Sequence, residues 1–188
     1  MAKINPNNEI WINDQLGWGI IPKNASSSIR HMIYQYLVDS KVDMNDHECI
    51  SSQKIKSLHK EKRTSSIKFA IKRDPVERFI SSYSDIVYRR NIEMSIEDCL
   101  KITEISEKNN KIHFISQYKL AGDINDYDYI FTIDQLDDVA NLIYQYTNFL
   151  PKVPWIKNHK DTKQLILTSS QEKIIAGHYK DDYDNGWF

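Results

Sequence analysis

A lysine followed by a run of small polar residues is the first stretch of this sequence that could do chemistry. From Ile29 onward, apolar residues recur at helical spacing, which predicts a helix that begins within the serine run, directly after an apolar strand. The free N–H groups of a helix N-terminus, with the positive end of the helix dipole behind them, suit a phosphate group. We therefore predict a phosphate site formed by Lys23, Asn24, Ala25, Ser26, Ser27 and Ser28.

This loop differs from the glycine-rich Walker A loop of mononucleotide-binding proteins. In Walker A the lysine follows the glycines and directly precedes a Ser or Thr that holds magnesium. Here Lys23 comes first, and no glycine lies between it and Ile29. No group is obviously placed to hold a magnesium ion between phosphates, so we expect no metal in the reaction.

An arginine and a serine follow the end of a second predicted strand. An alternating apolar segment ends at Arg73, and Pro75 opens the next helix. Arg73 and Ser81 offer a planar guanidinium and a hydroxyl to a second phosphate. The alternative is that Arg73 only pairs with its neighbours Asp74 or Glu77.

These two motifs resemble those of sulfotransferases that use 3′-phosphoadenosine-5′-phosphosulfate (PAPS), and most closely those of the carbohydrate group, both Golgi-type and bacterial. The order Pro-Lys-x-Ala-Ser-x-Ser at 22–28 is similar to the family's 5′-phosphosulfate loop. The order Arg-Asp-Pro-x-x-Arg-Phe-x-Ser-x-Tyr at 73–83 is similar to its 3′-phosphate motif. The resemblance implies sulfuryl transfer from PAPS to a hydroxyl acceptor, a glycan or a small molecule, with adenosine 3′,5′-bisphosphate (PAP) as the nucleotide product.

The resemblance extends to the second half of the chain. His113 and Gln117 are similar to a His-x-x-x-Gln element of the family, and the resemblance implies that they line the acceptor site. Lys157 and Lys160 stand where relatives carry basic residues that close over the nucleotide.

The acceptor hydroxyl must lose a proton, and histidine is the usual base near neutral pH. The resemblance places the family's base between the two phosphate motifs, where His47 is the best match. His59 lies in the same polar segment and stays an alternative, as does His113.

Strands that alternate with helices must position these groups. We predict strands at 9–13, 18–21 and 67–71, the first of them at an edge, and a helix after Pro75 with an apolar face that reaches Val87. The resemblance implies a further strand at 127–134, similar to the family's third core strand. Ser95 and Thr168 are expected to cap further helices. The pattern predicts an α/β fold, a parallel sheet with helices on both faces and the ligand at the carboxyl ends of the strands. The resemblance implies a three-layer, P-loop NTPase-like sulfotransferase fold, which we expect to be one domain over 1–188.

Composition narrows the possible partners. The formal charge is −1, from 25 basic and 26 acidic residues, so an anionic partner must be held by a local patch, and nucleic acid is not favoured. The two cysteines have neither metal-ligand spacing nor the density of a disulfide scaffold. No apolar run reaches the ~18 residues of a membrane span, and residues 1–13 lack the apolar core of a signal peptide. We expect a cytoplasmic protein.

Two other functions stay open at this point. One is a P-loop kinase-like phosphotransferase, which the missing Walker A pattern disfavours. The other is a nucleotide-binding relative without catalytic activity, because the choice of base among His47, His59 and His113 is open.

Overall fold

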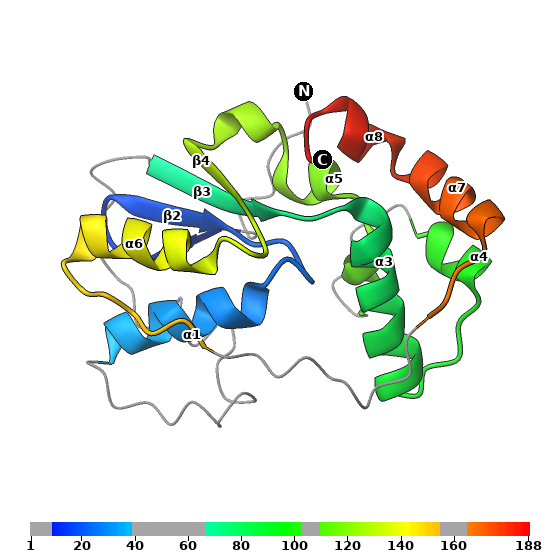
Figure 1. Cartoon of the computed structure of the whole chain (residues 1–188), viewed down its shortest axis with the longest axis horizontal. Helices are drawn as coiled ribbons and strands as arrows, with labels where there is room; N and C mark the ends of the chain where they lie inside the picture. The colour runs from blue at the N-terminus through cyan, green and yellow to red at the C-terminus, as the bar shows by residue number, and fades with distance from the viewer. Residues whose placement is uncertain (1–8, 39–66, 103–109, 155–164) are drawn as a thin grey trace.

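The computed structural model describes residues 9–38, 67–102, 110–154 and 165–188. It has a sheet of four described strands in the order β1 (Glu9–Trp11), β2 (Leu16–Gly19), β3 (Ile67–Lys72) and β4 (Tyr129–Thr132) (Figure 1). β1 pairs with β2 in antiparallel fashion, and the other two pairs are parallel. The predicted α/β class, with a mostly parallel sheet and β1 at its edge, is therefore confirmed.

Helices connect and flank these strands. They are α1 (Ser26–Leu37), α3 (Pro75–Tyr83), the π-helix η2 (Ser84–Arg89), α4 (Ile96–Leu100), the 3-10 helices η3 (Asn110–Phe114) and η4 (Ile124–Asp126), α5 (Gln117–Ala121), α6 (Leu136–Thr147), α7 (Ser169–His178) and α8 (Lys180–Asp184).

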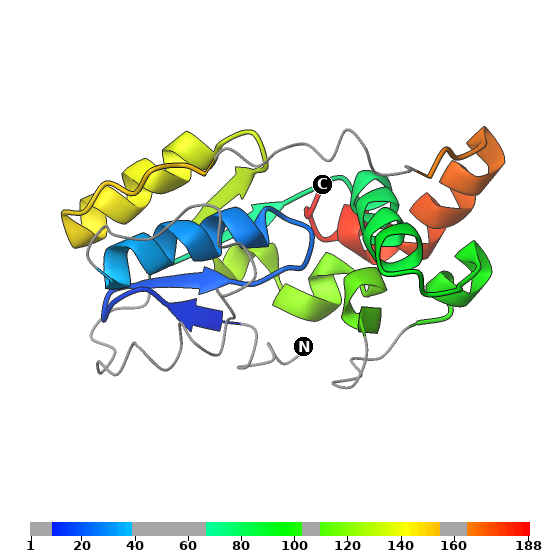
Figure 2. The same ribbon diagram turned by 90° about the horizontal axis from the view of Figure 1, so that it is seen from below.

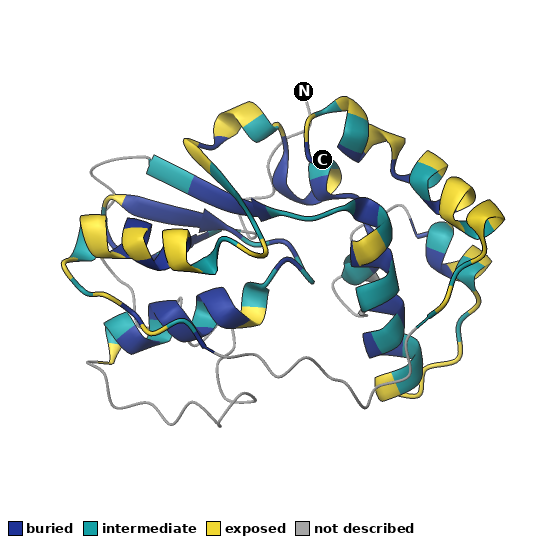
Figure 3. Ribbon diagram, viewed as in Figure 1, coloured by how far each residue is buried: buried dark blue, intermediate teal, exposed yellow. Residues whose placement is uncertain are grey.

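Two apolar clusters form on opposite faces of the sheet, because successive side chains of a strand point to opposite faces. Phe69 and Ile71 of β3 pack with α1 and α6, which lie on the same side of the sheet (Figure 2). Ala70 of β3 belongs to a second cluster that includes residues of α3, α5 and α7. Figure 3 shows β2, the centre of β3 and the inner sides of these helices as buried, whereas β4 is intermediate to exposed. The sheet is thus held rigidly by helices from both faces.

The predicted strand at 18–21 differs from the observed β2. Its pairing with β3 runs from Leu16 to Gly19 and stops there, because the chain turns and the N–H of Asn24 bonds to the carbonyl of Ile21 (3.3 Å). A Cβ atom on Gly19 would lie 2.6 Å from the ring of Tyr127, so only glycine fits at this strand end.

The helix starts predicted at Pro75, Ser95 and Thr168 are confirmed. Asp74 caps α3 with Pro75 in its first turn, Ser95 caps α4, and Thr168 forms a full capping box with Gln171 at α7. The helix predicted to follow Pro75 to Val87 ends as an α-helix at Tyr83 and continues as η2. α8 was not predicted.

No helix in the described ranges is long and apolar enough to cross a membrane.

Candidate active site

The loop between β2 and α1 has an unusual backbone. Lys23 and Ala25 both adopt left-handed conformations, with φ of 70° and 53°, which non-glycine residues seldom do. Asn24 between them is only 1% exposed, and its side-chain amide donates to the carbonyl of Ile71 (2.7 Å) and to Oε1 of Gln117 (2.6 Å). Asn24 therefore fixes the loop against the end of β3. Backbone strain of this kind persists only where neighbouring contacts enforce it, and it is common at functional sites.

The N-terminus of α1 is open to a ligand. Its first intrahelical bond runs from Ile29 N–H to the carbonyl of Ala25 (3.1 Å), so the N–H groups of the three preceding serines come before the hydrogen-bonded ladder. Ala25 supplies no side-chain cap, and the first turn holds no acidic residue. The hydroxyl of Ser28 is buried without a hydrogen-bond partner among the described residues. These groups suit an anion.

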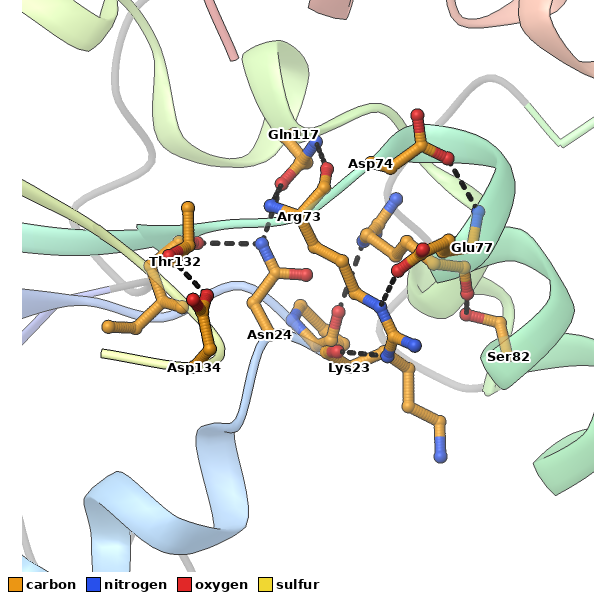
Figure 4. A network of polar contacts seen from close by, with 12 residues as sticks. Lys23, Asn24, Arg73, Asp74, Glu77, Ser82, Gln117, Thr132 and Asp134 are labelled. Carbon is orange, nitrogen blue, oxygen red and sulfur yellow. Dashed lines mark hydrogen bonds and ion pairs between the residues drawn. The ribbon is translucent and has the colours of Figure 1, made fainter. Parts of the chain in front are cut away.

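The two predicted phosphate motifs contact each other directly. Arg73 Nη1 donates to the backbone oxygen of Lys23 (3.1 Å). Gln117 joins the two strand ends, because its Oε1 accepts from Asn24 and from Arg73 N–H (3.1 Å) while its Nε2 donates to Arg73 O (2.8 Å). Figure 4 shows Gln117, Asn24, Arg73 and Lys23 converging in this way. The carboxyl ends of β2 and β3 are thus locked in register with each other.

The two arginines of the second motif, Arg73 and Arg78, contact different parts of the loop. Arg73 is half-buried, and its Nε lies 3.6 Å from Glu77, which is the pairing that sequence analysis kept as an alternative. Arg78 is fully buried, and its Nε donates to the carbonyl of Pro22 (3.1 Å), directly under the loop. The Nη atoms of Arg78 have no hydrogen-bond partner among the described residues. Arg78 therefore holds the start of the loop at Pro22 from the protein interior, while the less buried Arg73 contacts Lys23. Ser81 lies half-buried on the same helix.

A buried carboxylate pairs with the loop lysine. Lys23 Nζ lies 2.8 Å from Asp85 Oδ2, and Asp85 also pairs with Arg90 (3.0 Å) and Arg89. Burial lowers the pKa of Lys23, although its hydrogen bond and attraction to Asp85 oppose this. Burial alone would raise the pKa of Asp85, but the hydrogen bonds and charges of its three cations outweigh it and bring the pKa to about 2. The carboxyl group of Asp85 is therefore ionised at neutral pH.

His113 lies in the field of this cluster. Burial, followed by the positive charge of Lys23, lowers the pKa of His113 to about 3, so its imidazole is neutral at physiological pH. The hydroxyl of Ser82 lies 2.9 Å from the backbone oxygens of both His113 and Arg78, which ties η3 to α3. The His113 Nδ1 atom is buried without a hydrogen-bond partner in the described ranges.

The matching family profile, described as Sulfotransferase family, covers residues 10–183. The chain belongs to the sulfotransferase family. Comparison with curated proteins and with solved structures gave no match. The profile match begins in β1 and ends in α8, so both predicted phosphate motifs of this sulfotransferase and the helices beside them lie within it.

The structure of this sulfotransferase brings together Lys23, Asn24, Arg73, His113 and Gln117 of the predicted site. Gln117 is fully buried and its amide bonds to protein groups, so its contact with an acceptor stays a prediction. Four predicted residues lie outside the described ranges, and their roles also stay predictions: His47, His59, Lys157 and Lys160. In the described part of the chain, no group of three or more His, Cys, Asp or Glu residues could hold a metal ion.

Two supporting carboxylates were not predicted from the sequence. Asp182, which is fully buried, accepts from the N–H groups of Gln117 (3.0 Å) and Tyr118 (2.8 Å) and so anchors α5. Asp182 follows Tyr179 by three residues and directly precedes Tyr183, and an acidic residue between aromatic residues could have indicated a buried carboxylate. Asp85 stands four residues before Arg89, a spacing that predicts only a local ion pair. Its contact with Lys23 depends on the tertiary fold.

Proposed function

We propose that this protein transfers the sulfuryl group of PAPS to a hydroxyl group of a carbohydrate acceptor. The observation that carries the proposal is the contact between the two phosphate motifs, in which the Arg73 guanidinium lies 3.1 Å from the backbone oxygen of Lys23. One ligand with phosphate groups at both ends of an adenosine ribose would meet both motifs at once. A ligand with a single phosphate would use only one of them.

The residues present fit such a donor. Lys23, the N–H groups at the start of α1 and the hydroxyl of Ser28, which has no hydrogen-bond partner among the described residues, would hold the 5′-phosphosulfate. Arg73 and Ser81 would hold the 3′-phosphate, and this requires Arg73 to turn from the weakly paired, exposed Glu77. Lys157 and Lys160 would close over the nucleotide.

PAPS supplies an activated sulfuryl group and a phosphate that can depart. The ammonium of Lys23 and the α1 amides would stabilise the negative charge that grows on that phosphate in the transition state. His47 would accept the proton of the acceptor hydroxyl, with His59 as the alternative base. His113, neutral and close to Lys23, would line the acceptor site, and Gln117 would position the two phosphate-binding segments.

Several finer points of the proposal rest on the resemblance to the family alone. These are PAPS as donor, a carbohydrate as acceptor and a three-layer P-loop-like fold. A single domain over 1–188 and a cytoplasmic location are also proposed, from the length and composition of the sequence. A family member that binds the nucleotide without turnover is the competing proposal, and detection of a sulfated product from any glycan acceptor would reject it.

Calorimetry with two nucleotides tests the donor assignment. Arg73→Ala should weaken PAP binding by about 10- to 100-fold, which corresponds to one charge-assisted contact, and should change the affinity for adenosine 5′-monophosphate far less. Lys72→Ala is the matched control, because it removes a positive charge from the adjacent residue. Equal losses for the two nucleotides would show that Arg73 does not bind a 3′-phosphate.

A further inference from the structure

The carboxylate of Asp85 pairs with three cationic side chains. Its side chain is 7% exposed and pairs with Lys23 Nζ at 2.8 Å, with Arg90 Nη2 at 3.0 Å and with Arg89. A buried carboxylate that loses its one partner is strongly destabilised. Asp85 would keep two guanidinium partners if Lys23 moved away, so the departure of Lys23 does not leave an unpaired buried charge.

Lys23, in contrast, has one acidic partner among the described residues. Within the described ranges, Asp85 is the hydrogen-bond partner of the Lys23 ammonium, and the side chain of Lys23 is 21% exposed. An ammonium has three N–H donors and a flexible stem, so it can turn toward an anion that arrives beside it. The open N-terminus of α1 follows Lys23 within the same loop.

The π-helix η2 explains why two arginines can pair with the same carboxylate. Its backbone bonds join residues five apart, as in the Arg90 N–H bond to the carbonyl of Asp85 (3.1 Å). A turn of this width brings the residues four and five positions after Asp85 to the same side of the helix. Arg89 and Arg90 can both reach its carboxylate for this reason. Short π-helical segments occur frequently at functional sites.

We propose that Asp85 is a replaceable counter-ion, which holds Lys23 in the ligand-free protein and releases it to the 5′-phosphate when the nucleotide binds. The inference rests on the proposed function, because it takes Lys23 as the 5′-phosphate ligand. Binding then exchanges one charge-assisted hydrogen bond for another, while the two arginines keep Asp85 neutralised. Asp85 competes with the donor and lowers its affinity. It touches no reacting atom and is a positioning residue.

A double-mutant cycle with PAP as the probe tests this inference. Asp85→Asn should bind PAP about 10-fold more tightly than the unmodified chain in calorimetry, because Lys23 no longer has to leave a carboxylate. In the Lys23→Ala background the same Asp85→Asn change should give little gain, since no lysine remains to be released. Asp98→Asn is the matched control: it removes a carboxylate that pairs with a lysine on the exposed surface of α4.

Several results would overturn the inference. Weaker PAP binding by Asp85→Asn would mean that Asp85 holds Lys23 in place for the ligand, and unchanged binding would mean that Asp85 does not compete with it. An equal gain with and without Lys23 would reduce the effect to long-range electrostatics. Absence of PAP binding to the unmodified chain would instead refute the proposed function itself, which separates the two failures.

A crystal structure of the unmodified protein with PAP gives a second test that does not depend on how the variants fold. The Lys23 ammonium should lie within hydrogen-bond distance of the 5′-phosphate and outside that distance from Asp85. An ammonium that still contacts Asp85 in the complex would overturn the exchange.

Discussion

The ammonium of Lys23 and the carboxylate of Asp85 lie 2.8 Å apart, and this pair joins the phosphate loop to the π-helix η2. Lys23 belongs to the first motif of the sequence, whereas Asp85 lies two residues beyond the end of the second. Their contact partly neutralises the positive charge of the loop, although Asp85 itself binds no ligand in the proposed function. It also links the stability of this sulfotransferase to pH.

The first prediction concerns that pH dependence. The folded-state pKa of Asp85 is about 2, below its ordinary value of 3.8, so its stabilising contribution is present above pH ~4 and is lost as the pH falls toward 2. Asp85→Asn should lower the free energy of unfolding by about 1–2 kcal/mol at pH 7, after allowance for solvent screening. The difference from the unmodified chain should shrink between pH 4 and 3, as measured by urea unfolding.

Glu97→Gln is the control for this measurement, because it neutralises an exposed carboxylate on α4. A deficit of Asp85→Asn that stays the same from pH 7 to pH 3 would show that the ion cluster is not its source.

The second prediction concerns Gln117, whose buried amide joins Asn24 to Arg73. Gln117→Ala removes the partner of the backbone N–H and carbonyl of Arg73 and one of the two acceptors of the Asn24 amide, which should cost about 2–4 kcal/mol of unfolding free energy. Gln117→Ala should also weaken the binding of PAP and of adenosine 5′-monophosphate to a similar degree, because both predicted phosphate motifs lose the residue that bonds to each of them. Thermal melts and calorimetry measure the two effects.

Gln145→Ala on the exposed side of α6 is the matched control and should change neither quantity. If Gln117→Ala kept full stability and lost only activity toward an acceptor, Gln117 would contact the substrate, as its resemblance to the family implies.

These contacts show which part of the site could be predicted from sequence. Helix starts at Pro75, Ser95 and Thr168 were predictable, because capping depends on residues within one turn of each other. The bond between Asn24 and Gln117 spans 93 positions and carries no local signal. The α-to-π transition after Tyr83 was also hidden, since the apolar face continues smoothly into η2.

The third prediction concerns the charge state of His113. Burial and then the positive charge of Lys23 lower its pKa to about 3, so its imidazole resonances should not shift between pH 5 and pH 8 in an NMR titration. Lys23→Met removes a nearby positive charge and should raise the pKa of His113, while burial still holds it below 6.5. A titration of His113 near pH 6.5 in the unmodified chain would contradict this and would restore His113 as a candidate base.

The fourth prediction separates sulfuryl transfer from phosphoryl transfer. We expect transfer from PAPS to continue in the presence of a chelator of divalent ions. Asp134 is the carboxylate that follows β4, where it accepts a hydrogen bond from Thr132 (2.5 Å) on the side of the sheet next to Asn24 (Figure 4). In a kinase, such a residue would hold magnesium, and Asp134→Asn would abolish activity. Activity with ATP that required both magnesium and Asp134 would favour the kinase.

The last prediction separates the roles of Lys23 and His47. Lys23 would stabilise charge that grows on the departing phosphate, so Lys23→Ala should lower kcat strongly, with a smaller loss of donor affinity. His47, as the base, would contact only the acceptor proton. His47→Ala should therefore leave PAP affinity nearly unchanged, lower kcat by about 10²–10⁴-fold and remove the acidic limb of the pH–rate profile near pH ~6.5.

Parallel measurements on His59→Ala and His113→Ala decide between the three candidate bases. His113 is neutral over the whole range in which an acidic limb near pH ~6.5 would appear, so its replacement should leave the position of that limb unchanged in kcat/KM. Loss of the limb in His59→Ala, with near-normal turnover in His47→Ala, would assign the base to His59. Neither outcome would change the proposed phosphate site, because Lys23, Arg73 and Gln117 are held together by contacts that involve none of these histidine side chains.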